Sequence, residues 1–339
     1  MSTETVRTAL EKALGLASGA PATVDRLWPL AGGASMETWA VDAVVAGAPE
    51  ALVVRKDMAV NMHASALSRR DEFALLAAAH AAGVPCPRPR WVLEMGDRPA
   101  REAFAMDRCP GESVGRRVVR MPELSDARRV LAGQLGEALA KIHMVPLTEA
   151  LAFLPRPTRG QTPAEACLLE LRDAMAALKR DNPVWAYGYR WLQGHRPAPT
   201  GDLTLVHGDF RVGNLLVLPT GLGTVIDWEF SHVGDPAEDL AWCTVRDWRF
   251  EKDALEVGGV GTRAQLHEGY HRAGGREVDD ATLRWWEVAG NLRWAVVCHA
   301  QCQRHLGGRD RSVELASLGR KAAEMEWELL ALIEKENDR

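Results

Sequence analysis

Three oxygen-bearing side chains, Asp209, Asn214 and Asp227, lie close together in the sequence and could together carry out phosphoryl transfer. One carboxylate and one amide oxygen, side by side, suit a hard cation such as Mg²⁺ that also holds phosphate oxygens. A second carboxylate facing the same ligand can accept the proton of a substrate hydroxyl. We therefore expect Asp209 to be a general base, and Asn214 and Asp227 to be the two magnesium ligands.

The local pattern predicts a β-hairpin that would bring Asn214 and Asp227 together. Two short apolar runs, 215–218 and 224–226, are separated by the turn residues 219–223. A hairpin brings its outer ends together, so the residue before the first strand and the residue after the second become neighbours. Asp209 stands five residues before Asn214 in a loop that contains glycine, near enough to face the same ligand.

The elements that must position these side chains divide into a sheet-rich first part and a helical second part. Alternating or β-branched runs predict an antiparallel meander and two further strands, at 24–29, 37–45, 51–55, 90–94 and 103–107. Apolar residues at three- and four-residue spacing predict helices at 68–82, 125–143, 163–179, 282–305 and 311–334. The expected fold class is α+β, with an antiparallel-sheet lobe at 1–107 and a larger helical lobe at 108–339.

Composition and charge exclude several classes of partner. The formal net charge is -5, which gives no electrostatic support for a nucleic-acid partner. No apolar run reaches the roughly 20 residues needed to span a bilayer, and the first residues lack the pattern of a secretory signal. Six scattered cysteines are typical of reduced thiols. We expect a cytoplasmic protein that acts on a small molecule, with its oligomeric state left open.

The segment His207-Gly-Asp-Phe-Arg-Val-Gly-Asn214 resembles the catalytic loop of the aminoglycoside phosphotransferase and choline kinase-like family, relatives of the protein kinases. The resemblance places the base on Asp209 and the metal ligands on Asn214 and Asp227. It also places Arg211 where kinases have a lysine that steadies the transferring phosphate. It implies a bilobal, protein-kinase-like fold with ATP as the donor and Mg²⁺ as the metal, and it leaves GTP open.

A second block, 234–241, also resembles this family. Its sequence is Gly-Asp-Pro-Ala-Glu-Asp-Leu-Ala, and its aspartates are expected to cap and brace the catalytic loop. His143, at the end of a long predicted helix, falls where the family often has a histidine, and we expect a structural role for it.

The first lobe carries further matches to the nucleotide site. Gly32, Gly33, Ala34 and Ser35 follow a predicted strand and could cover the phosphates with backbone N–H groups, although a plain turn is the alternative. Met106-Asp107-Arg108 resembles the hinge whose backbone holds adenine, and Met106 and Arg108 are therefore expected at the nucleotide.

The strand 52–56 resembles the V-A-I-K strand of kinases and places Arg55 where most of them have lysine. Arg55 and Lys56 point to opposite faces of a strand, so only one is expected to reach the phosphates, and we favour Arg55. Glu72, in the predicted helix 68–82, corresponds to the glutamate that pairs with this cation. An exposed helix carboxylate is the alternative for Glu72.

The acceptor is expected to bind against the variable segment 151–199. This segment is mildly basic and holds Trp185, Tyr187, Tyr189 and Trp191, which favours a neutral or anionic acceptor with an apolar part over a polycationic aminoglycoside. Ordinary helix packing is the alternative for these residues.

The runs 32–39 and 52–55 resemble the branch of kinase-like domains associated with acyl-CoA dehydrogenases. That resemblance implies a hydroxy acid, a hydroxyacyl-CoA or a similar alcohol as acceptor. An antibiotic kinase for aminoglycosides or macrolides, a non-catalytic nucleotide-binding pseudokinase and a helical scaffold are the alternatives. The pseudokinase draws support from Arg55 in place of lysine.

Overall fold

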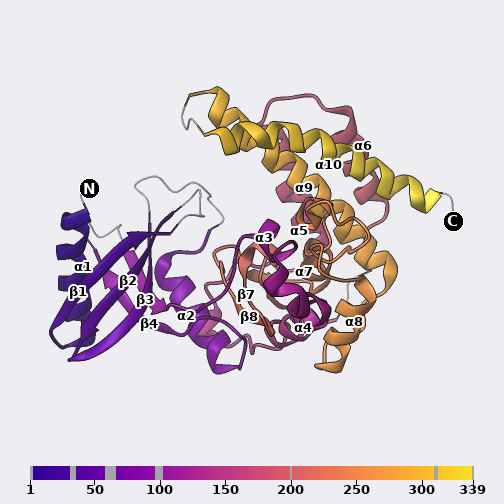
Figure 1. Cartoon of the computed structure of the whole chain (residues 1–339). Coiled ribbons are helices and arrows are strands. Elements are labelled where there is room, and N and C mark those ends of the chain that lie inside the picture. The colour runs from indigo at the N-terminus through magenta and orange to yellow at the C-terminus, as the bar shows by residue number, and fades with distance from the viewer. Residues whose placement is uncertain are drawn as a thin grey trace.

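The chain folds into a sheet lobe and a helical lobe that pack against each other (Figure 1). The computed structural model describes residues 3–30, 36–57, 66–95, 102–198, 201–308 and 312–337. The expected glycine-rich loop, from Gly32 to Ser35, lies outside the described residues.

The first lobe is a five-stranded antiparallel sheet, as predicted, with spatial order β1-β2-β3-β5-β4. Helix α1 (Thr3–Ser18) covers one face through Leu10 and Leu14, which are fully buried. We propose that the lobe ends at Asp107, where β5 ends. The strands are β1 (Ala22–Pro29), β2 (Met36–Val45), β3 (Ala48–Asp57), β4 (Pro89–Glu94) and β5 (Glu102–Asp107).

Helix α2 (Arg69–Ala81) lies between the sheet and the second lobe. The Ser68 hydroxyl caps it by accepting the backbone N–H of Asp71 at 3.1 Å, which satisfies one of the free donors of the first turn. Its Leu75 packs in a core that continues from the inner face of the sheet into the helical lobe. The first turn therefore has a fixed position, and it carries Glu72 into the interface between the lobes.

The second lobe is mainly helical and has two small two-stranded sheets. Strand β6 (Thr204–Val206) pairs with β9 (His232–Gly234), and β7 (Leu215–Leu218) pairs with β8 (Gly221–Val225). The helices are α3 (Gly115–Val118), α4 (Ser125–His143), α5 (Pro163–Ala177), α6 (Pro183–Gly194), α7 (Ala237–Trp242), α8 (Arg263–Arg272), α9 (Asp280–Leu306) and α10 (Val313–Asn337).

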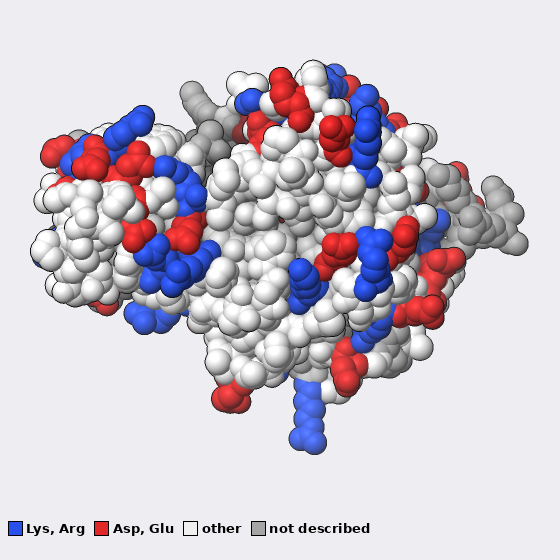
Figure 2. Space-filling view, turned by 60° about the horizontal axis from the view of Figure 1, so that its bottom comes forward, with Lys and Arg blue, Asp and Glu red and all other residues white. Residues whose placement is uncertain are grey.

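Figure 2 shows acidic and basic side chains interspersed on the face it presents, and neither sign forms a broad field. None of the helices in the described part of the chain combines the length and the apolar character needed to cross a bilayer.

Helices α4 and α8 approach each other closely because both have glycine at the crossing. A Cβ placed on Gly136 would lie 2.0 Å from the carbonyl oxygen of Leu266 and 2.6 Å from the backbone nitrogen of Tyr270. Backbone atoms cannot move away as a flexible side chain can. The crossing therefore requires glycine at position 136.

The substitution Gly136→Ala should destabilise the protein by about 1–3 kcal/mol, because the methyl group overpacks the helix crossing. Urea unfolding followed by circular dichroism measures this. Gly133→Ala, one turn earlier in the same helix, is the control: its Cβ would lie 3.7 Å from an arginine side chain, so it should be neutral or gain up to about 1 kcal/mol from helix propensity. Equal effects of the two variants would contradict the close crossing.

Candidate active site

The loop that holds Asp209 runs from β6 to β7 and depends on a glycine beside it. Gly208 has a φ of +81°, in the left-handed region that favours glycine. A Cβ at this position would lie 2.3 Å from the carbonyl oxygen of Phe230. Both the backbone conformation and the close approach therefore exclude a side chain at position 208.

The fully buried carboxylate of Asp239 braces this loop from α7. It accepts the backbone N–H groups of His207 at 2.7 Å and Gly208 at 3.0 Å. His143 lies 3.2 Å away from the same carboxylate and 2.8 Å from the hydroxyl of Tyr270 on α8. The family-like block at 234–241 thus lies where it supports the loop, and His143 packs behind it.

The Asp209 carboxylate is held by three donors from different parts of the site. The side-chain amide of Asn214 donates to Oδ2 at 2.6 Å, and Nε of Arg211 lies 3.1 Å from Oδ1. The indole N–H of Trp242, at the end of α7, donates to Oδ1 at 2.8 Å. The carboxylate is therefore fixed in orientation while it lines the large cavity described below.

Arg211 is itself held by an aromatic ring. Its guanidinium carbon lies 4.8 Å from the ring centre of Trp248, which in turn contacts Trp242 with ring centres 5.5 Å apart. Trp294 completes the cluster at 4.8 Å from Trp248. One group of tryptophans thus supports both Arg211 and the Asp209 carboxylate.

The predicted hairpin is present and brings Asn214 and Asp227 together. Leu215 pairs with Val225, and the N–H of Ile226 donates to the carbonyl oxygen of Asn214 at 2.9 Å. The turn is shorter than expected, since only residues 219–220 separate the strands. Asp227 follows with a φ of +69°, a conformation that aspartate tolerates better than most side chains.

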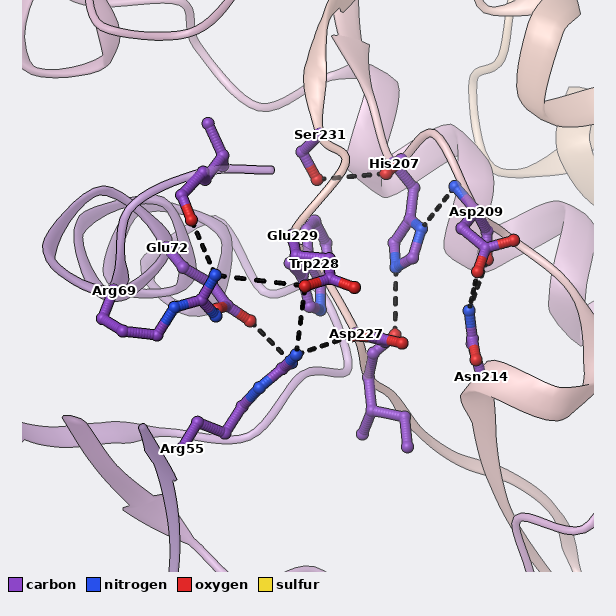
Figure 3. A network of polar contacts seen from close by, with 12 residues as sticks. Arg55, Arg69, Glu72, His207, Asp209, Asn214, Asp227, Trp228, Glu229 and Ser231 are labelled. Atoms are coloured by element: carbon purple, nitrogen blue, oxygen red, sulfur yellow. Dashed lines mark hydrogen bonds and ion pairs between the residues drawn. The ribbon is translucent and has the colours of Figure 1, made fainter. Parts of the chain in front are cut away.

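Arg55 is the junction between the lobes (Figure 3). Its Nη1 donates to Glu72 Oε1 at 2.7 Å, and its Nη2 donates to Asp227 Oδ1 at 2.8 Å. Arg69, which is 2% exposed, holds the second oxygen of Glu72. Lys56 instead pairs with Glu37 at 3.1 Å, and of these two adjacent cations only Arg55 lines the cavity.

Asp227 and Glu229, two of the carboxylates near Arg55, have shifted pKa values. Burial opposes ionisation of Asp227, but the charge of Arg55 and its hydrogen bond outweigh burial and lower the pKa of Asp227 below its ordinary value. Burial, and after it the charge of Asp227, raises the pKa of Glu229 to about 7. Asp227 therefore stays ionised in this crowded group.

A cavity of about 1700 Å³ runs between the lobes, and Arg55, Asp209, Arg211, Asn214 and Asp227 all line it. Its first end is lined by Val53 and Met106 from the sheet and by Leu216 and Ile226 from the hairpin, which form an apolar slot. Arg108 also lines this end, and its guanidinium is held by Asp42 at 2.6 Å and lies over Trp28. The structure describes four of the residues expected at the nucleotide. Arg55, Met106 and Arg108 line the cavity, whereas Glu72 is buried behind Arg55.

The second end of the cavity lies against α5, α7, α9 and the start of α10. The segment 151–199 contributes Arg156 and the inner face of α5, but its four singled-out aromatic side chains do not line this cavity. Trp185 and Trp191 are buried in the helical core, and neither Tyr187 nor Tyr189 lines the cavity. Among the arginines and lysines in the described part of this segment, only Arg156 lines the cavity.

Three charged side chains to which the sequence analysis gave no role of their own lie on this second end. Arg293 of α9 pairs with Glu238 of α7, Nη1 to Oε1, at 2.6 Å. His232 of β9 approaches the other oxygen of Glu238 at 3.2 Å. All three line the cavity.

The fold and the site together define a bilobal, protein-kinase-like phosphotransferase. A family model described as "Phosphotransferase enzyme family" matches residues 27–277, and the chain belongs to this family of small-molecule kinases. Acyl-CoA dehydrogenase family member 10 of Mus musculus is 30% identical over 202 residues, which are 56% of this chain and 18% of that protein. The chain thus spans less than a quarter of that relative's length.

Solved structures show the same fold over nearly the whole chain. A candidate aminoglycoside phosphotransferase from Ralstonia eutropha JMP134 superposes with a TM-score of 0.71 at 21% identity, covering 97% of this chain and 98% of that one. Spectinomycin phosphotransferase APH(9)-Ia, in complex with ADP and spectinomycin, has a TM-score of 0.61 at 13% identity, covering 95% and 98%. At such identities the likeness establishes the fold alone.

The pH dependence of stability should reveal the His232–Glu238 pair. Burial alone would lower the pKa of His232, but Glu238 raises it to about 9, above the ordinary value of 6.5. A raised pKa contributes stability that is fully present below about pH 6.5 and is lost as the pH rises through about 9. His232→Gln should therefore cost up to about 3 kcal/mol at pH 6 and much less at pH 9.5.

Urea unfolding at the two pH values measures this difference. His80→Gln, at an exposed position on α2, is the control and should change stability little at either pH. A cost for His232→Gln that is the same at pH 6 and pH 9.5 would show that the pair does not form.

Proposed function

We propose that the protein transfers the γ-phosphate of ATP to a hydroxyl group of a small molecule in an Mg²⁺-dependent reaction. The observation that carries this proposal is the Asp209 carboxylate, fixed by three donors on the wall of a cavity whose other end is an apolar slot. Phosphoryl transfer depends mainly on alignment and charge neutralisation, and this arrangement supplies groups for both.

The residues present fit a magnesium–nucleotide complex. Asn214 uses its amide nitrogen on Asp209, which leaves the amide oxygen as a ligand, and Asp227 offers an ionised carboxylate. Such oxygen ligands are what Mg²⁺ prefers, and when bound it would neutralise charge on the phosphate oxygens. Arg55 stands beside Asp227, where it can hold the phosphate tail.

In this proposal, Asp209 accepts the proton of the acceptor hydroxyl and orients its oxygen. Arg211, already held at Asp209 and over the ring of Trp248, offsets negative charge on the transferring group. Glu72 keeps Arg55 in place, and Arg69 keeps Glu72 in place. The apolar slot at Met106 and Val53 receives the adenine base.

For the acceptor, we propose a hydroxy acid, a hydroxyacyl-CoA or a similar alcohol. The similarity to acyl-CoA dehydrogenase family members supports this choice. Solved structures of antibiotic kinases make an antibiotic the second candidate. The presence of Asp209, Asn214 and Asp227 in one site disfavours a pseudokinase, and Arg55 makes the contacts expected of the usual lysine.

Asp209→Asn should lower turnover by roughly 10²- to 10⁴-fold, the usual contribution of a general base. ADP release over a panel of alcohols measures turnover, and thermal shift with Mg·ATP checks that the nucleotide still binds. Asp202→Asn, at an exposed position ahead of β6, is the control. Unchanged turnover in Asp209→Asn, with ATP bound, would refute the assignment of the base.

Trp242→Phe should lower kcat by about tenfold while the KM for ATP changes little. The variant removes a hydrogen bond to a charged group, worth about 1.5–3 kcal/mol, but keeps most of the ring's packing. Steady-state kinetics with the best acceptor measures both constants, and Trp327→Phe, at an exposed position on α10, is the control. A rise in KM for ATP with kcat unchanged would show that Trp242 does not position Asp209.

A further inference from the structure

The cluster of Arg293, Glu238 and His232 contains more positive than negative charge. His232 Nδ1 lies 3.0 Å from the carbonyl oxygen of Phe230, and its Nε2 lies 3.2 Å from the Glu238 carboxylate. Both partners accept hydrogen bonds, so both ring nitrogens carry a proton and the ring is an imidazolium. Glu238 is therefore shared between two cations, His232 and Arg293.

The other side of the Arg293 guanidinium meets no buried anion among the described residues. Nη2 lies 3.7 Å from the thiol of Cys167, and burial raises the pKa of that thiol to about 12, so it is neutral. The remaining carboxylate is Glu170, at 4.0 Å with its side chain 75% exposed. An exposed ion pair at this distance contributes little and leaves Glu170 able to turn away.

The position of the cluster suits recognition of the acceptor. Glu238 and Trp242 are one turn apart on α7, so their side chains lie on the same face, and Trp242 contacts Asp209. Val297 and Leu171 line the same end of the cavity and offer apolar surface, beside the carboxylates of Glu170, Asp173 and Glu314. A ligand can thus place an anionic group at Arg293, an apolar chain along the wall and a hydroxyl at Asp209.

We propose that Arg293 binds the carboxylate of the phosphoryl acceptor and that the accepted substrates are hydroxy acids with an apolar chain in their free-acid form. This deepens the proposed function and rests on it for the reaction. The hydroxyl oxygen forms a bond to the γ-phosphorus, the bond from that phosphorus to ADP breaks, and the hydroxyl proton passes to Asp209. The carboxylate takes no part in the bond changes and sets which alcohol is held at Asp209.

A binding experiment with a probe that cannot be phosphorylated tests the subsite independently of the reaction. Isothermal titration of the full chain should show octanoate binding more tightly than octanamide by roughly 10- to 100-fold, the range of a hydrogen bond between charged groups. Arg293→Gln should abolish this preference. Arg284→Gln should keep it, because Arg284 is on the same helix with the same side-chain exposure of 26% but does not line the cavity.

A second variant keeps the test decisive if Arg293→Gln does not fold. Glu170→Gln removes the competing exposed carboxylate and should tighten octanoate binding by roughly 1.5- to 5-fold, with octanamide unchanged. The proposal is overturned if wild type does not prefer octanoate, or if the preference survives in Arg293→Gln and is unaltered in Glu170→Gln.

Turnover then separates the subsite from the proposed function. ADP release with 8-hydroxyoctanoate and with its methyl ester should favour the acid in wild type and in Arg284→Gln, and Arg293→Gln should remove this preference. If octanoate binds as expected but no hydroxy acid is phosphorylated, the subsite stands and the proposed function fails. If alcohols are phosphorylated with no difference between acid and ester, the proposed function stands and the subsite fails.

Discussion

The buried carboxylate of Asp239 is the constraint on which the site depends. A carboxylate with no exposure to solvent must have its oxygens satisfied, and here two backbone N–H groups of the loop that holds Asp209, together with His143, do so. The loop cannot move from α7 without leaving these buried oxygens short of hydrogen-bond donors. The same short helix carries Glu238 toward Arg293 and Trp242 toward Asp209. One element of six residues therefore fixes the loop, the Asp209 carboxylate and the wall opposite.

Arg55 makes a second link, between the lobes, and its chemistry differs from that of the usual lysine. An ammonium is a point charge, whereas the guanidinium presents a planar fork. Here one nitrogen reaches Glu72 in the sheet lobe while the other reaches Asp227 in the helical lobe. The fork thus joins an element of each lobe through a single side chain. Because arginine is not deprotonated in proteins, burial cannot neutralise it, and its charge helps to keep the pKa of Asp227 below the ordinary value.

The elements that could be predicted from the sequence are those whose structure depends on residues close together in the chain. The sheet lobe, the helix at 125–143 and the hairpin after Asn214 are present, because strand alternation, helical spacing and turn residues act over a few positions. Short elements were missed: β9 has three residues and pairs with β6, far away in the chain. The helix at 163–179 ends earlier, at Ala177, and Lys179 has a φ of +48°.

Contacts between distant segments left no local pattern to detect. Trp242 donates to Asp209 across 33 positions, and Arg293 meets Glu238 across 55. A tryptophan at the end of a short helix has the same sequence signature whether it packs in a core or holds a carboxylate. For the same reason, Trp185 and Trp191 were expected at the acceptor but lie in the helical core. The one available signal for Trp242 was its place directly after the family-like block at 234–241.

The two ends of the cavity consequently differ in how far short sequence motifs specify their residues. The end that we propose for the nucleotide is built around the hairpin and two strands of the sheet, so short motifs specify most of its chemistry. The end that we propose for the acceptor needs α5, α7, β9 and α9 to meet, and each contributes one or two side chains that carry no motif of their own. A partly buried cation there is stabilised by partners from other segments. Arg293 has such a partner on one side, in Glu238. On its other side, an anion supplied by the substrate would place Arg293 between two carboxylates, as Arg55 lies between Glu72 and Asp227.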